Sequence, residues 1–297
     1  MTSGPDVPLD ESQIYAMVQE SYSAAVKDHN GEHAHKVATA FGYSEKQLAS
    51  IPKDANLGLS CGNPLVLAQL REAETVVDLG SGAGFDIFLA AKKVGPQGKA
   101  IGVDMNKDML DRAERNKEKS GFENVSFVES RITEVRLPDA IADCIISNCV
   151  VNLVPEGQKQ LVFNEMYRLL KPGGRVAISD MLARKDLSPE LKRDMVLYVG
   201  CIAGASQVKD YEVYLRKAGF DEILIVDANN DLNVYKRKVA QPLSQCSDTD
   251  AASPCCQTSS CWNSWDAGCT SKAKRSDLNQ LDFNELAGSF KIYAVKG

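Results

Sequence analysis

The amino-acid sequence predicts an α/β fold, in which a mostly parallel, doubly wound sheet carries a smaller α+β module after about residue 183. Three observations lead to this prediction. From residue 75 onward, short apolar segments alternate with amphipathic segments of helical spacing. The first apolar segment runs directly into a glycine-rich loop. Because parallel neighbours need crossover connections, this alternation indicates helices on both faces of one sheet.

The predicted elements follow one another in regular order. Apolar segments that end at turn residues predict strands at 75–80, 99–105, 125–130, 143–149 and 174–182. Apolar residues three and four apart predict helices at 11–29, 85–94, 107–121 and 156–170. The second module should contain helices at 188–200 and 208–219, a strand at 222–228 and a strand-like end at 281–297. The first helix precedes the sheet and should cover it as a cap.

Composition limits the classes of protein to consider. The chain has 297 residues, 44% of them apolar and 25% charged, which is ordinary for a globular protein. Its net charge of −6 argues against a protein that follows nucleic-acid phosphates. The N-terminal residues lack the apolar segment of a secretory signal, and no apolar run approaches the roughly 18 residues that span a bilayer. We therefore expect a soluble, cytoplasmic monomer that binds neither nucleic acid nor membrane.

A glycine-rich loop joins the first predicted strand to its helix, with the sequence DLGSGAG at residues 78–84. Glycines let the backbone turn tightly and approach a ligand beyond the carboxyl end of the strand. The acidic residue Asp104 ends the second strand, where a carboxylate can accept ribose hydroxyls. The glycine spacing differs from the dinucleotide pattern G-x-G-x-x-G, although a nicotinamide-dependent dehydrogenase stays the main alternative.

Residues 70–182 resemble class I S-adenosylmethionine-dependent methyltransferases in the segments VVDLGSGAGFD, GVDMNKDML, DCIISN and LKPGGRVAISD. The resemblance implies a Rossmann-like sheet with S-adenosylmethionine as cofactor, in a domain formed by residues 1–182. It implies that Asp104 binds the ribose and that Met105 and Ile132 lie beside the adenine. The methionine moiety would lie near Asp78 and the loop residues Gly80, Ser81, Gly82 and Gly84.

Nine cysteines fall into two groups. Cys61, Cys144, Cys149 and Cys201 lie in apolar, ordered-looking sequence, whereas Cys246, Cys255, Cys256, Cys261 and Cys269 lie in the polar segment 241–276. Cysteine is often a small buried apolar residue, and Cys144, inside a predicted strand, fits that interpretation. In the second group the spacings do not match paired C-x2-C zinc motifs, which leaves a flexible thiol donor or an incidental surface loop.

The other three cysteines lie in distinctive contexts: IPKDANLGLSCGNP around Cys61, SNCVVNL around Cys149 and YVGCIAGA around Cys201. Together with GYSE at 42–45, they resemble arsenite methyltransferases over residues 41–226. The resemblance implies that these three cysteines bind and process the arsenic, and that residues 183–297 form an arsenic-binding module. Tyr22 would belong to a cap over the cofactor.

Thiolate chemistry agrees with this resemblance. A soft, thiophilic centre prefers sulfur ligands, and three thiolates around trivalent arsenic leave its lone pair available for a methyl carbon. The expected substrates are arsenite or its glutathione adduct, and the products methylated arsenicals. A cysteine pair can supply two electrons by closing a disulfide, which glutathione or thioredoxin would reopen.

One departure from the family concerns the region before Cys61. Many members carry a further cysteine there for a disulfide relay, whereas residues 1–60 contain none, so the relay partner of Cys61 stays open. Three histidines, His29, His33 and His35, are expected at a solvated helix end rather than in a metal site. The alternative functions are methylation of an organic small molecule and sequestration of a metalloid without catalysis.

Overall fold

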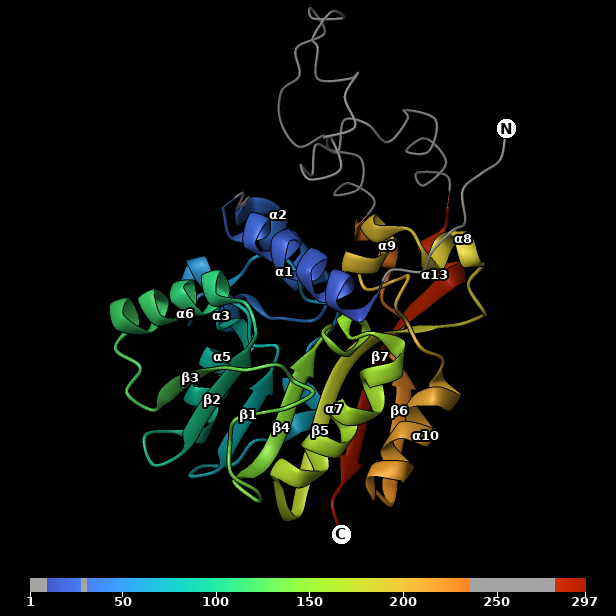
Figure 1. Cartoon of the computed structure of the whole chain (residues 1–297). Helices are drawn as coiled ribbons and strands as arrows, with labels where there is room; N and C mark the ends of the chain where they lie inside the picture. The colour runs from blue at the N-terminus through green and yellow to red at the C-terminus, as the bar shows by residue number, and fades with distance from the viewer. Residues whose placement is uncertain (1–9, 28–30, 236–280) are drawn as a thin grey trace, which may run out of the picture.

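The computed structural model describes residues 10–27, 31–235 and 281–297. A seven-stranded sheet with the order β3-β2-β1-β4-β5-β7-β6 forms its centre (Figure 1). The strands are β1 (Thr75–Leu79), β2 (Lys99–Asp104), β3 (Val125–Glu129), β4 (Ala142–Asn148), β5 (Leu170–Ala183), β6 (Glu222–Asp227) and β7 (Ala287–Val295). The first five pair in parallel, and β7 lies antiparallel between β5 and β6. The predicted doubly wound α/β fold is confirmed.

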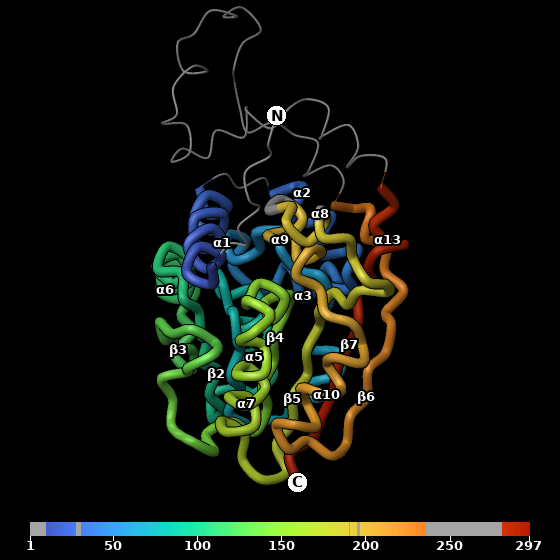
Figure 2. Tube along the Cα trace, turned by 45° about the vertical axis from the view of Figure 1, so that its right-hand side comes forward, coloured from blue at the N-terminus to red at the C-terminus, as the bar shows by residue number. Residues whose placement is uncertain are grey.

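Helices cover both faces of the sheet and the carboxyl ends of its parallel strands. The α-helices are α1 (Glu11–Lys27), α2 (Gly31–Ala40), α3 (Glu45–Leu48), α4 (Leu65–Ala68), α5 (Phe85–Val94), α6 (Lys107–Ser120), α7 (Lys159–Leu169), α8 (Pro189–Lys192), α9 (Met195–Val199), α10 (Val208–Ala218) and α13 (Phe283–Leu286). Short 3-10 helices are η1 (Lys53–Ala55), η2 (Val151–Leu153), η3 (Glu156–Gln158) and η4 (Leu232–Tyr235). Figures 1 and 2 show α1, α2 and α9 above the strand ends, and α7 beside α10 along the sheet.

Two apolar cores lie on opposite faces of the sheet because side chains alternate along each strand. Ile145 of β4 packs with Phe163 of α7 and Leu215 of α10 in one core. Its neighbour Ile146 packs with Phe88 of α5 in the other core. A third cluster, above the carboxyl ends, contains Cys61, Cys149 and Cys201 together with Val18 of α1 and Leu197 of α9. The fold thus collects the three cysteines at one end of the sheet.

The C-terminal part differs in detail from the sequence prediction. The helix expected at 188–200 is divided into α8 and α9, because the side chain of Asp194 accepts the backbone N–H of Leu197 at 3.1 Å and starts a new helix. Strands β6 and β7 pair with β5 in the one continuous sheet. The division into domains 1–182 and 183–297 stays a prediction.

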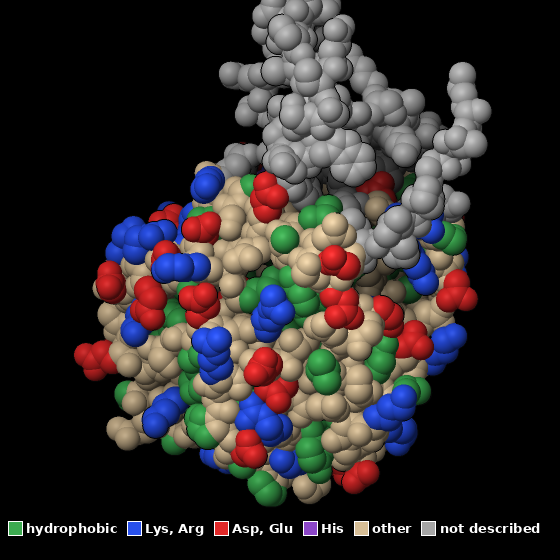
Figure 3. Space-filling view, viewed as in Figure 1, with side chains coloured by type: hydrophobic (Ala, Val, Ile, Leu, Met, Phe, Trp, Pro, Cys, Tyr) green, Lys and Arg blue, Asp and Glu red, His purple; other side chains and the backbone are tan. Residues whose placement is uncertain are grey.

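On the face shown in Figure 3, basic and acidic side chains are interspersed over α7 and α10, without a broad area of either sign. Among the described residues, no helix has the length and apolar composition needed to cross a membrane.

Candidate active site

The glycine-rich loop turns sharply at the end of β1. The backbone N–H groups of Gly80 and Ser81 donate to the carbonyl of Val103 at 2.8 and 3.0 Å, which fixes the loop against β2. Gly80 has a φ of 81°, and a Cβ there would lie 2.6 Å from the side chain of Val150. Glycine is therefore required at residue 80 by both backbone conformation and space.

A pocket enclosing about 1020 Å³, part of it open to solvent, lies above this loop. Seven of the eight residues predicted to bind the cofactor line it: Asp78, Gly80, Ser81, Gly82, Asp104, Met105 and Ile132. Gly84 instead caps the N-terminus of α5 with a φ of 95°, and a Cβ there would lie 2.5 Å from Phe88. Tyr15 and Tyr22 of α1 line the opposite side, so α1 covers the pocket.

Three carboxyls line this pocket: Asp78 and Asp86 are buried, and Asp104 is partly exposed. Burial raises the pKa of Asp78 well above its usual value, and the nearby Asp86 and Asp104 add to the effect. Burial also raises the pKa of Asp86 to about 6 and that of Asp104, although Asp104 accepts the backbone N–H groups of Gly82 and Asn106 at 2.9 and 2.8 Å. A cationic ligand would stabilise the ionised carboxylates, so the pocket suits a molecule that carries positive charge.

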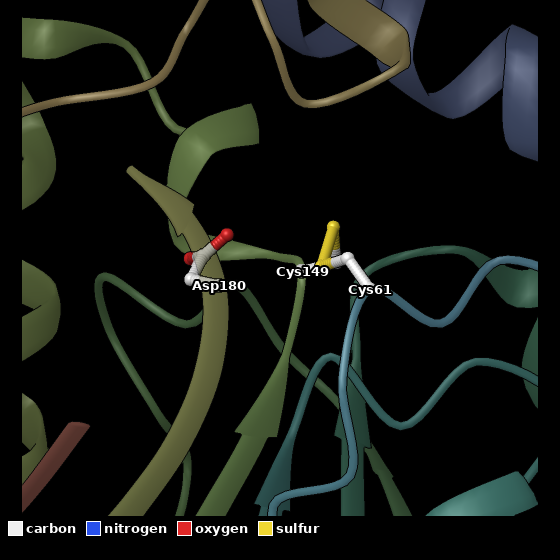
Figure 4. Close-up of side chains that lie close together, drawn as sticks. All are labelled: Cys61, Cys149 and Asp180. Carbon is white, nitrogen blue, oxygen red and sulfur yellow. A yellow bond between two sulfur atoms is a disulfide. The ribbon is translucent and has the colours of Figure 1, made fainter. Parts of the chain in front are cut away.

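The thiol pair lies beside this pocket. Cys61 and Cys149 form a disulfide with a Cα–Cα distance of 5.7 Å. Cys149 immediately follows β4 and also lines the pocket, whereas Cys61 comes from the segment before α4 (Figure 4). A carboxylate oxygen of Asp180 on β5 lies within 4.8 Å of both sulfur atoms. The disulfide pair thus lies between the pocket and strand β5.

Cys201 lies against the same pair. Its sulfur donates to the carbonyl oxygen of Cys149 at 3.0 Å, and its side chain is 3% exposed. Cys149 and Cys201 have φ values of 61° and 63°, a left-handed conformation that costs energy outside glycine. Burial raises the pKa of Tyr22 well above its usual value, and the nearby Cys201 adds to this shift. Cys201 therefore lies near both Cys149 and Tyr22, although neither Cys201 nor Cys61 is among the residues that line the pocket.

A buried hydrogen-bond network joins the thiol segment to the acidic pocket. Asn148 accepts the backbone N–H of Cys61 at 3.2 Å and donates to Asp86 at 2.8 Å. The hydroxyl of Tyr43 donates to the other oxygen of Asp86 at 2.6 Å. These contacts show why GYSE and SNC belong to one site: both segments hold Asp86 in place.

The other singled-out residues lie away from the pocket or outside the described part. Cys144 of β4 is fully buried in the core that contains Phe88 of α5. Burial raises the pKa of its thiol to about 12, as expected for a core cysteine. His35 contacts Glu45 at 2.9 Å on the surface. His29 and all five cysteines of the second group lie outside the described residues.

Sequence reasoning missed four polar residues of this region: the buried Tyr43, Asp86 and Asp180, and the partly buried Asn148. All four lie within motifs that were singled out, GYSE, VVDLGSGAGFD, SNC and LKPGGRVAISD. A polar residue inside a buried motif needs a partner, and that requirement was the available signal. In each case, however, the hydrogen-bond partner is distant in the sequence.

Comparison with known proteins places the chain in a family. The model of the family described as "Methyltransferase domain" matches residues 70–219, which is more than half of the chain. An arsenite methyltransferase of Halobacterium salinarum is 45% identical over 206 residues, covering 65% of this chain and 52% of that protein. The human arsenite methyltransferase is 34% identical over 195 residues, covering 63% and 51%. The chain thus spans about half the length of these relatives.

Solved structures show the same fold. An arsenic(III) S-adenosylmethionine methyltransferase from Chlamydomonas reinhardtii has a TM-score of 0.52 at 24% identity, covering 91% of this chain and 74% of that one. Phosphoethanolamine N-methyltransferase 2 of Haemonchus contortus, solved with S-adenosyl-L-methionine, has a TM-score of 0.57 at 18% identity, covering 90% and 57%. With its glycine-loop pocket at the carboxyl ends of a doubly wound sheet, the chain belongs to the methyltransferase domain family and is similar to arsenite methyltransferases.

Proposed function

We propose that this protein is an arsenite methyltransferase that moves methyl groups from S-adenosylmethionine to thiolate-bound trivalent arsenic. The observation that carries the proposal is the position of Cys149, which lines the acidic pocket, pairs with Cys61 and accepts the thiol of Cys201 at its carbonyl. The names of the similar curated proteins support the same substrate.

The pocket residues fit S-adenosylmethionine, which supplies an electrophilic methyl group on a positively charged sulfonium. Its positive charges match the carboxyls of Asp78, Asp86 and Asp104. Asp104 would exchange its backbone contacts for ribose hydroxyls, while Met105 and Ile132 border the adenine. The hydroxyl of Ser81 is buried against Gly102 of β2 without a hydrogen-bond partner among the described residues, so it would have to turn toward the pocket to donate to the bound molecule.

Arsenic binding requires the reduced pair, because a disulfide offers no thiolate. After reduction, Cys61, Cys149 and Cys201 would each exchange a thiol proton and an arsenic hydroxide for an As–S bond and water. Three thiolates make a neutral pyramidal complex in an apolar cluster that excludes water. The arsenic lone pair would then face the pocket from its Cys149 side, held at close approach to the methyl carbon.

The methyl-transfer step needs no general base, since the arsenic lone pair forms the new As–C bond as the S–CH3 bond breaks. Arsenic becomes formally pentavalent and cationic. Closing the Cys61–Cys149 disulfide breaks both of their As–S bonds and returns two electrons to arsenic. Water would then add to the cationic arsenic and lose a proton, which leaves a neutral methylated trivalent species with one hydroxide on Cys201 until water or another thiol releases it. The disulfide in this structure corresponds to that stage, and a small thiol or a thioredoxin-like protein would reopen it.

The test is to incubate the protein with arsenite, methyl-labelled S-adenosylmethionine and a thiol, and to follow the arsenic species by chromatography. We expect methylarsenite and dimethylarsenite, loss of both products in Cys61→Ser, Cys149→Ser and Cys201→Ser, and retention in Cys144→Ser. Arsenite binding without labelled product would instead indicate sequestration. Label transfer to an organic acceptor that is insensitive to arsenite would indicate a different methyltransferase.

A further inference from the structure

The side-chain ammonium of Lys159, at the start of α7, is buried although its residue type is normally exposed. The residue is 1% exposed. Its nitrogen donates to Glu156 Oε2 at 2.8 Å, to the carbonyl of Gly204 at 2.6 Å and to the hydroxyl of Ser206 at 2.7 Å. A buried charge persists only where such partners replace water, so Lys159 strongly favours this arrangement of its acceptors.

Two of these three acceptors belong to the segment 202–206, which directly follows Cys201. The ammonium therefore joins α7 to the segment that carries the third thiol. On its other side this segment is closely packed: a Cβ at Gly204 would lie 2.1 Å from the carbonyl oxygen of Asn152. The side-chain amide of Asn152 also lies 3.4 Å from the carbonyl of Cys201. Both ends of the short segment are thus fixed to the body of the protein.

The attachment of the segment 202–206 offsets the conformational cost of the backbone at Cys201. Cys201 has a φ of 63°, and such a conformation persists in a cysteine only where its surroundings enforce it. The enforced conformation aims its sulfur at the carbonyl of Cys149, 3.0 Å away. A released segment would relax toward ordinary φ values and carry the sulfur away from Cys149.

We propose that Lys159 is a positioning residue that holds Cys201 against Cys149 and so completes the three-sulfur site. The role in arsenic binding rests on the proposed function, whereas the position of the thiol does not. Lys159 is not among the residues that line the pocket, and two of its three hydrogen bonds run to the segment 202–206, through which it would act.

The test compares Lys159→Met with the wild type in two measurements. In the reduced protein, alkylation of Cys201 by iodoacetamide, followed by mass spectrometry of its peptide, should be roughly tenfold faster in the variant because the segment opens more often. Arsenite affinity should fall roughly tenfold, since the third arm of a chelate is lost. Affinity for S-adenosylmethionine should stay unchanged.

Three further variants make the result specific. Arg175→Met removes another largely buried cation, paired with Glu74 at 2.8 Å, and should alter neither readout. Ser206→Ala removes one acceptor and should change both readouts in the same direction to a smaller extent, which keeps the test available if Lys159→Met does not fold. In a Cys201→Ser background, Lys159→Met should cause no additional loss of arsenite affinity.

Wild-type rates of Cys201 alkylation in both Lys159→Met and Ser206→Ala would overturn the proposal, as would additive losses in the double variant. A reduced wild type that does not bind arsenite would overturn the proposed function alone, because the alkylation of Cys201 still measures what Lys159 does.

Discussion

The side chain of Asn148 accepts the backbone N–H of Cys61 at 3.2 Å and donates to Asp86 at 2.8 Å. One amide therefore contacts both a cysteine of the disulfide pair and a carboxyl of the glycine-loop pocket. Asn148 also directly precedes Cys149 in the chain, so it lies next to both cysteines of the disulfide pair.

Asn148→Ala should weaken both halves of the site. The change leaves a buried N–H at Cys61 without its acceptor, which costs about 1–3 kcal/mol of unfolding free energy, and it removes a donor from Asp86. We expect lower affinity for S-adenosylmethionine by calorimetry and a lower midpoint in urea unfolding. Asn124→Ala, which also removes two side-chain-to-backbone bonds, should lower the midpoint alone. Unchanged S-adenosylmethionine affinity in Asn148→Ala would show that Asn148 does not support the pocket through Asp86.

Tyr43→Phe should change the pH dependence of donor binding. Burial raises the pKa of Asp86 to about 6, and the hydrogen bond from Tyr43 holds it below a still higher value. An ionised Asp86 attracts a cation, so affinity should rise as pH increases through about 6 in the wild type. Without the tyrosine hydroxyl, the midpoint should move to higher pH. Tyr214→Phe, which removes a hydrogen bond to Glu156 on the surface, serves as the control. Identical pH profiles of S-adenosylmethionine affinity for all three proteins would argue against this role of Tyr43.

Asp180→Asn should remove a pH-dependent part of the stability. Burial raises the pKa of Asp180 from 3.8 to about 6, despite hydrogen bonds from Tyr211 and Met181. The folded state therefore holds a proton that the unfolded state releases, and the associated stability is full below pH 3.8 and lost as pH rises through about 6. At about 1.4 kcal/mol per pKa unit, the shift corresponds to about 3 kcal/mol. Urea unfolding between pH 4 and 7 at fixed redox state should show a smaller slope in Asp180→Asn than in the wild type, because the buried Asp78 and Asp86 still contribute.

Asp143→Asn provides a control of opposite sign. Burial works to raise the pKa of Asp143, but hydrogen bonds from Lys171 and the backbone of Thr75 hold it below its usual value. Its contribution to stability should be lost as pH falls, not as it rises. A slope in Asp180→Asn equal to that of the wild type would show that Asp180 is not the group responsible.

The buried cysteines should differ sharply in reactivity. Peptide mapping of the air-oxidised protein should recover a Cys61–Cys149 disulfide, and brief reduction should make both residues available to alkylation. Cys144 should stay unmodified until denaturant is added, because its thiol is fully buried and burial raises its pKa to about 12. Labelling of Cys144 as fast as Cys149 in the folded protein would contradict this assignment.

Gly80→Ala should abolish S-adenosylmethionine binding, whereas a matched glycine elsewhere in the chain should tolerate the same change. At residue 80 the added carbon would lie 2.6 Å from Val150 and displace the loop. Gly121 also has a positive φ, 68°, but no atom lies within 4 Å of a Cβ there. Gly121→Ala should therefore cost only about 1–2 kcal/mol of unfolding free energy and leave S-adenosylmethionine binding intact. Equal binding by both variants would show that the loop does not approach the ligand.

Much of the fold could be read from the sequence because its signals are local. The period of apolar residues identified the strands and the main helices, and the glycine loop with Asp104 identified the pocket. The split between α8 and α9 was missed because the capping side chain of Asp194 competes with a helical pattern that otherwise continues. That competition depends on how the segment packs.

The sequence by itself determined the alternation of elements, the glycine loop and the candidate set of three thiols. Only the tertiary structure decided that Cys61 pairs with Cys149, that Cys201 contacts the same residue, and that Lys159 is buried beside the segment after it. Periodicity and turn chemistry act over a few residues, whereas these contacts join positions 88, 52 and 45 residues apart. Such pairs are specified by the packing of the whole sheet and its helices, which no local pattern records.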